Sequence, residues 1–123
     1  MTEDEDNLTI EDVVSVCKNA SNETIEIKRT NPFNSKTSDF LEKYELSFDD
    51  IVWIVKRIKS CDYHSGPLPD YNPNNKHPLW VFIKDILIKN VRIYIYIKIK
   101  IIDHRRKIIV YSLHEEGIHN DKK

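Results

Sequence analysis

The sequence is poor in the small and reactive residues on which several functional classes depend. Among its 123 residues there are only two glycines and two cysteines. Two glycines cannot form a glycine-rich phosphate-binding loop, which excludes the common nucleotide-binding motifs. Cys17 and Cys61 are too few for a disulfide scaffold and have no metal-ligand spacing. We therefore expect two buried, reduced thiols, with no metal and no cofactor.

The chain also lacks a long apolar run. Its most apolar stretch, Val91–Ile102, is interrupted by three basic residues, so it is too short and too charged to span a bilayer. Residues 1–6 are acidic and do not have the basic and apolar regions of a signal peptide. We expect a soluble cytoplasmic protein without a membrane partner, folded as one domain with frayed ends at residues 1–8 and 117–123.

A net charge of −1 argues against purely electrostatic binding of a nucleic acid. The charge is unevenly distributed, however. Residues 1–60 carry 8 Lys and Arg against 13 Asp and Glu, whereas residues 61–123 carry 11 against 7. Between residues 84 and 107 there are eight basic side chains and two acidic ones. The near-zero net charge of the whole chain is therefore the sum of a basic C-terminal half and an acidic N-terminal half.

The first half of the sequence predicts three helices and one short strand. Apolar residues recur at helical spacing after Thr9, which forms a weakened capping box with the acid three residues later. A second helix is expected to be capped by Thr37 or Ser38, and a third by Ser47 with acids in its first turn. Residues 23–29 alternate in polarity, as in a strand.

The second half predicts an antiparallel sheet. Cys61–Pro78 holds four of the five prolines and is expected to be a long loop. Strands follow at residues 79–87, 91–102 and 107–114, separated by turns. The expected fold is therefore α+β, an antiparallel β-meander in the C-terminal half with two or three N-terminal helices packed on one face.

The longest predicted strand has two chemically different faces. Its isoleucines alternate with polar residues, so one face belongs under the helices. The opposite face carries Arg92, Tyr94, Tyr96, Lys98 and Lys100. Cations interleaved with phenol rings suit a phosphate backbone and stacked bases. The alternative is a solvated sheet face with lysines that protect against edge-to-edge association.

Two histidines are candidate acid and base residues for RNA cleavage. A metal-free ribonuclease needs a base for the ribose 2′-hydroxyl, a cation for the phosphorane and an acid for the leaving 5′-oxygen. Histidine suits the acid and base roles near neutral pH. His64 opens the proline-rich segment, and His114 ends the last predicted strand on the face of Ser112 and opposite Tyr111.

Five short segments together resemble one protein family. They are L-S-F-D-D at 46–50, D-Y-H-S-G-P-L-P-D at 62–70, L-W-V-F-I-K at 79–84, I-Y-I-K-I-K-I at 95–101 and Y-S-L-H-E-E at 111–116. In this order they resemble the MqsR-type toxins of type II toxin–antitoxin systems, over about residues 33–116. The resemblance implies a RelE-like fold and a metal-independent endoribonuclease, an mRNA interferase, held inactive by an antitoxin from a neighbouring gene.

The resemblance also implies an active face. It would hold Lys84, Tyr96, Lys98 and His114, with the 62–64 segment beside it. His64 or His114 would accept the 2′-hydroxyl proton, and the other histidine or Tyr96 would protonate the leaving oxygen. The expected RNA-binding residues are Trp80, Lys84, Arg92, Tyr94 and Lys100.

Three positions depart from the family pattern. Better-studied members have Lys at the position of Ser65, Gln at that of Val81 and Lys at that of His114. The I-Y-I-K repeat also leaves open which of its tyrosines and lysines reaches the substrate, since a two-residue slip keeps the same face. Two other functions stay open: an RNA-binding module without catalysis, and a protein-interaction domain that docks a partner strand.

Overall fold

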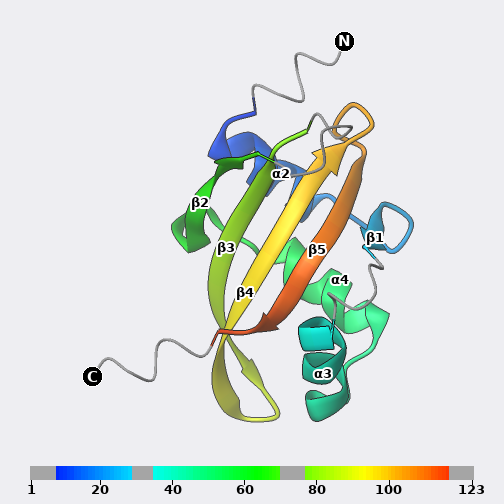
Figure 1. Cartoon of the computed structure of the whole chain (residues 1–123), viewed down its shortest axis with the longest axis vertical. Coiled ribbons are helices and arrows are strands. Elements are labelled where there is room, and N and C mark those ends of the chain that lie inside the picture. The colour runs from blue at the N-terminus through cyan, green and yellow to red at the C-terminus, as the bar shows by residue number, and fades with distance from the viewer. Residues whose placement is uncertain (1–7, 29–34, 70–76, 117–123) are drawn as a thin grey trace.

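The computed structural model describes residues 8–28, 35–69 and 77–116 of the chain (Figure 1). The fold is α+β, with helices first and most strands in the C-terminal half, as the sequence predicts. The elements are α2 (Ile10–Lys18), β1 (Ile25–Ile27), α3 (Ser35–Tyr44), α4 (Phe48–Lys56), a 3-10 turn η1 (Ser60–Asp62), β2 (Tyr63–Leu68), β3 (Leu79–Ile88), β4 (Val91–Ile102) and β5 (Lys107–Glu115).

The five strands form one mixed sheet in the order β1-β5-β4-β3-β2. The predicted meander of β3, β4 and β5 is confirmed, because each of these strands is antiparallel to the next. β1 adds to it in parallel along the outer side of β5, so the sheet is not wholly antiparallel. In Figure 1 the helices α2 and α4 lie behind the long strands, and α3 lies beside the end of β5.

The predicted helix starts are correct in two cases. The Thr9 hydroxyl accepts a hydrogen bond from Asp12 N (3.1 Å), and the Asp12 carboxylate accepts one from Thr9 N (2.9 Å). Ser47 N likewise donates to the Asp50 carboxylate (2.8 Å). The cap expected at Thr37 or Ser38 is wrong, because α3 already begins at Ser35.

The predicted loop at residues 61–78 is only partly a loop. Residues 60–62 form η1, and residues 63–68 form β2, which pairs with β3 at the edge of the sheet. The sequence hid this strand because glycine and proline are rare in strand interiors, although an edge strand tolerates them. Gly66 fits here for two reasons. Its φ of +125° is a conformation that residues with a side chain rarely adopt, and an added Cβ atom would lie only 2.8 Å from Leu79 O.

The core lies between the helices and one face of β4. The five predicted isoleucines, Ile93, Ile95, Ile97, Ile99 and Ile101, are all at most 2% exposed. Apolar residues of all three helices belong to the same cluster, among them Val13, Phe40 and Ile51. Leu8 is 7% exposed in this cluster, so the expected fraying does not include it. The ends at 1–7 and 117–123 lie outside the described residues.

The two cysteines differ in environment. Cys17 is fully buried, as expected, and burial raises the pKa of its thiol to about 12. Cys61 is exposed, which corrects the expectation of a second buried thiol. It lies in the 3-10 turn η1, none of whose residues is buried.

This difference predicts selective thiol labelling. At pH 8 a thiol reagent is expected to modify Cys61 quickly and Cys17 only after denaturation, because the thiolate is the nucleophile and the Cys17 thiolate is strongly disfavoured. Counting modified thiols by mass spectrometry in buffer and in guanidinium checks this. Two fast-reacting thiols in the native protein would contradict the burial of Cys17.

Candidate active site

The sheet surface opposite the helices carries the candidate residues. The strand register places Tyr96 directly opposite His114, and Lys98 directly opposite Ser112. Directly paired residues point to the same face of a sheet. We call this surface, formed by the even-numbered residues of β4 and their partners on β3 and β5, the Tyr/Lys face. It therefore brings together three predicted residues, Tyr96, Lys98 and His114.

Tyr96 and His114 stack on each other. Their ring centroids are 5.0 Å apart and their planes differ by 18°. His114 Nδ1 lies 3.0 Å from the backbone oxygen of Glu115. A carbonyl oxygen can only accept a hydrogen bond, so Nδ1 carries the hydrogen in this arrangement. In the neutral ring Nε2 then has a free lone pair, which is what a general base requires.

The electrostatics around Tyr96 favour its neutral form. Partial burial, and secondarily the negative charge of Glu116, raise the pKa of the Tyr96 phenol above its ordinary value of about 10. The hydroxyl therefore keeps its proton at neutral pH. Tyr96 can donate a hydrogen bond or a proton, and His114 is the better base of the stacked pair.

Lys98 is the available cation beside this pair. Within the described parts of the chain, its ammonium group makes no hydrogen bond or ion pair. Arg92, by contrast, is bound through Nε and Nη2 to the Asp85 carboxylate, and its guanidinium lies 5.8 Å from the Tyr94 ring centre. The predicted RNA-binding residues Arg92 and Tyr94 thus lie on the Tyr/Lys face, but the Arg92 charge is neutralised by Asp85.

A β-bulge changes the face at Tyr111. Lys98 pairs with Ser112 and Ile99 pairs with Val110, so Tyr111 is an extra residue on β5. Its ring lies 5.2 Å from Lys100 Nζ, on the Tyr/Lys face rather than on the opposite one as strict alternation predicts. Lys100 shares this face but is 2% exposed, which corrects its assignment as a directly RNA-binding residue.

Two other residues that the sequence predicts to bind RNA lie on the face that the helices cover. Lys84 pairs with Ile95 and Trp80 pairs with Ile99, and both isoleucines face the helices. Lys84 Nζ forms an ion pair with Asp62 Oδ2 (3.2 Å), in which each side chain is 11% exposed. Trp80 is 2% exposed in the core and cannot stack on a base. The sequence could not predict the face on which Lys84 and Trp80 lie, because that face depends on how β3 pairs with β4.

His64 is not close to His114. It is an exposed residue of β2, and its Nδ1 lies 3.2 Å from Ser65 Oγ. Strands β3 and β4 separate β2 from β5, which corresponds to about 14 Å between the two backbones. A mechanism in which these two histidines act on one phosphate is therefore not supported by this arrangement.

Helix α3 holds the end of β5 that carries His114. Beyond Val110, the ladder between β1 and β5 ends, and the free edge of β5 is taken over by α3. Leu113 N donates a hydrogen bond to Thr37 Oγ1 (3.1 Å). Tyr44 OH and Lys43 Nζ both bind Glu115 Oε1, at 3.1 and 3.2 Å. No local sequence signal could reveal these contacts, because the partners are more than 70 residues apart in sequence.

Replacing Thr37 tests this support of β5. Thr37→Val keeps the shape but leaves the buried Leu113 amide without its acceptor, so we expect a loss of about 1–3 kcal/mol in the free energy of unfolding. Thr37→Ser keeps the hydroxyl and is the matched control. Urea unfolding of both variants measures the effect, and equal stability of the valine and serine variants would contradict it.

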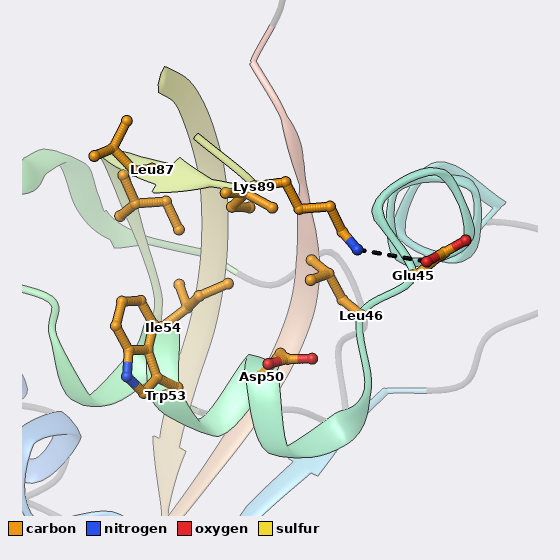
Figure 2. A pocket seen from close by; sticks show the side chains of 9 residues that line it. Glu45, Leu46, Asp50, Trp53, Ile54, Leu87 and Lys89 are labelled. Carbon is orange, nitrogen blue, oxygen red and sulfur yellow. Dashed lines mark hydrogen bonds and ion pairs between the residues drawn. The ribbon is translucent and has the colours of Figure 1, made fainter. Parts of the chain in front are cut away.

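A separate hollow of about 360 Å³ lies between α4 and the end of the β3–β4 hairpin (Figure 2). Figure 2 shows it between α4, which contributes Trp53 and Ile54, and the end of β3, which contributes Leu87. Lys89 and Glu45 form an ion pair at its edge (3.4 Å). Its lining combines apolar side chains with three charged ones, Glu45, Asp50 and Lys89, and includes none of the predicted site residues.

Among the helices of the described residues, none has the length and apolarity that a membrane crossing needs. No group of three His, Cys, Asp or Glu side chains in residues 8–28, 35–69 and 77–116 is arranged to hold a metal ion. Comparison of the chain with protein-family models, curated proteins and solved structures found no match.

Proposed function

We propose that this chain is a metal-independent endoribonuclease that cleaves mRNA, the toxin of a type II toxin–antitoxin system. The observation that carries the proposal is the stacked Tyr96–His114 pair with Lys98 beside it on the same face. These three side chains supply a base, a proton donor and a cation, the set that transesterification of RNA requires. The resemblance to the MqsR-type toxins supports the same reaction.

The reaction proceeds in one displacement. His114 Nε2 takes the proton of the ribose 2′-hydroxyl, and the 2′-oxygen attacks the neighbouring phosphorus. The P–O5′ bond breaks, and the Tyr96 hydroxyl gives its proton to the leaving 5′-oxygen. Lys98 stabilises the extra negative charge of the phosphorane. A proton then returns from the imidazolium to the Tyr96 phenolate through solvent. The products are a 2′,3′-cyclic phosphate and a 5′-hydroxyl end.

The raised pKa of Tyr96 is compatible with this role. An alkoxide leaving group is a much stronger base than a phenolate, so a weakly acidic phenol can still protonate it. The mRNA partner, a cytoplasmic location and an antitoxin from a neighbouring gene belong to the same proposal. They rest on the family resemblance.

Cleavage of RNA by the purified protein tests the proposal. Incubation with a transcript in EDTA is expected to produce fragments with 2′,3′-cyclic phosphate and 5′-hydroxyl ends. Expression of the chain without an antitoxin is expected to stop growth and degrade mRNA. An intact transcript together with normal growth and intact cellular mRNA would refute the proposal. Binding of the transcript without cleavage would favour a non-catalytic RNA-binding module instead.

A further inference from the structure

Lys28 brings a further cation to the Tyr/Lys face. It follows β1 directly, and its backbone N–H donates to Val110 O (2.9 Å), which continues the parallel pairing by one residue. Its Nζ lies 5.4 Å from the centre of the Tyr111 ring. The Lys100 ammonium lies 5.2 Å from the same ring. The Tyr111 bulge thus places one aromatic ring near two cations from strands on either side of β5.

The charges of this region are predominantly positive. Lys98 lies on the same face, opposite Ser112, the residue after Tyr111. Two acidic side chains of the face are held in ion pairs: Glu26, two residues before Lys28, pairs with Lys107, and Asp85 pairs with Arg92. Lysines of like charge grouped on one surface create a positive potential that attracts phosphate. Because Lys100 is buried, Lys28 and Lys98 are the cations that a ligand can contact.

The spacing along β5 suits a nucleic-acid chain. Tyr111 is three residues from His114, about 10 Å along the strand, with Lys98 between them. An extended RNA strand whose scissile phosphate lies at Tyr96 and His114 would pass Lys98 and bring a neighbouring phosphate to Lys28. The faces of the Tyr111 ring already have cation neighbours, so electrostatic contact to a phosphate fits this position better than base stacking.

We propose that Lys28 forms a second phosphate-binding position for single-stranded RNA, next to the site of cleavage. This inference rests on the proposed function. It gives the substrate a direction along β5, from His114 toward Tyr111. It also assigns a role to a residue that lies in the acidic N-terminal half of the sequence and that composition alone would not associate with RNA.

Salt-dependent binding tests the inference. The probe is a fluorescent 2′-O-methyl oligoribonucleotide, which keeps its phosphates but lacks the attacking hydroxyl. For Lys28→Gln, we expect a higher Kd at low salt and a slope of log Kd against log salt that is smaller by about 0.7, the contribution of one phosphate contact on a single strand. Lys28→Arg keeps the charge and is expected to keep the wild-type slope. Lys18→Gln, an exposed lysine at the end of α2 in the helix layer, is the matched control.

The outcomes separate this inference from the proposed function. A Lys28→Gln slope equal to that of Lys18→Gln, or a wild type that does not bind the probe, would overturn the inference. Cleavage of an unmodified transcript by the wild type is measured in parallel. Cleavage with an unchanged Lys28→Gln slope would overturn only the inference. A reduced slope in a protein that never cleaves RNA would support the phosphate position and overturn the proposed nuclease.

Discussion

His114→Ala is expected to lower the rate of RNA cleavage by about 10²–10⁴-fold, the usual contribution of a general base. The alanine side chain cannot accept the 2′-hydroxyl proton, while the position and charge of Lys98 are unaffected. The rate is measured under single-turnover conditions on a short labelled RNA. Binding of the 2′-O-methyl oligoribonucleotide is expected to remain close to wild type, because the imidazole contributes to the chemical step more than to affinity.

The other histidines serve as matched controls for this result. His104→Ala removes an exposed histidine from the β4–β5 turn and is expected to leave cleavage unchanged. His64→Ala removes the histidine on β2, and we expect a rate close to wild type because two strands separate it from His114. A large loss in His64→Ala with none in His114→Ala would show that the base has been assigned to the wrong histidine.

Asp62→Ala is expected to destabilise the fold by about 3 kcal/mol. The substitution leaves the Lys84 ammonium without its partner in a site where each side chain of the pair is only 11% exposed, and an uncompensated buried charge is costly. It also removes the carboxylate that accepts a hydrogen bond from Lys59 N (2.9 Å) at the start of η1. Chemical denaturation measures the change in the free energy of unfolding.

A double variant separates the structural role of Lys84 from a catalytic one. Asp62→Leu combined with Lys84→Met replaces the ion pair by apolar side chains, and we expect most of the stability to return. If Lys84 is structural, this variant still cleaves RNA. Full stability with complete loss of cleavage would instead place Lys84 in the reaction. Glu26→Ala, which breaks the exposed pair with Lys107, is the control and is expected to change stability little.

Sequence pattern was a good guide wherever one local signal decides the structure. The alternation of isoleucine with polar residues predicted β4 at its exact bounds, Val91–Ile102, because period two marks a half-buried strand. Thr9 predicted a helix start through its capping box with Asp12, and Ser47 predicted another through the acids in its first turn. It failed at β2, whose glycine and proline conceal an edge strand.

The sequence also predicted which residue types form the candidate site, but it could not predict which particular tyrosine and lysine belong to it. A basic second half and a strand of tyrosines and lysines pointed to the sheet face on which we propose that RNA binds. The register between β4 and β5 places Tyr96, and not Tyr94, directly opposite His114. Burial of Lys100 selected Lys98 as the available lysine. Neither choice is visible in a dipeptide repeat, because its successive units are chemically equivalent.

The sequence by itself determined the α+β class, the core face of β4 and the charge asymmetry, since these follow from periodicity and composition within short segments. Only the tertiary structure decided that Lys84 and Trp80 face the core, that β3 and β4 separate His64 from His114, and that α3 and Lys28 reach β5. The physical reason is that these relations depend on strand pairing, a bulge and contacts between distant segments, and each can change without altering any local pattern.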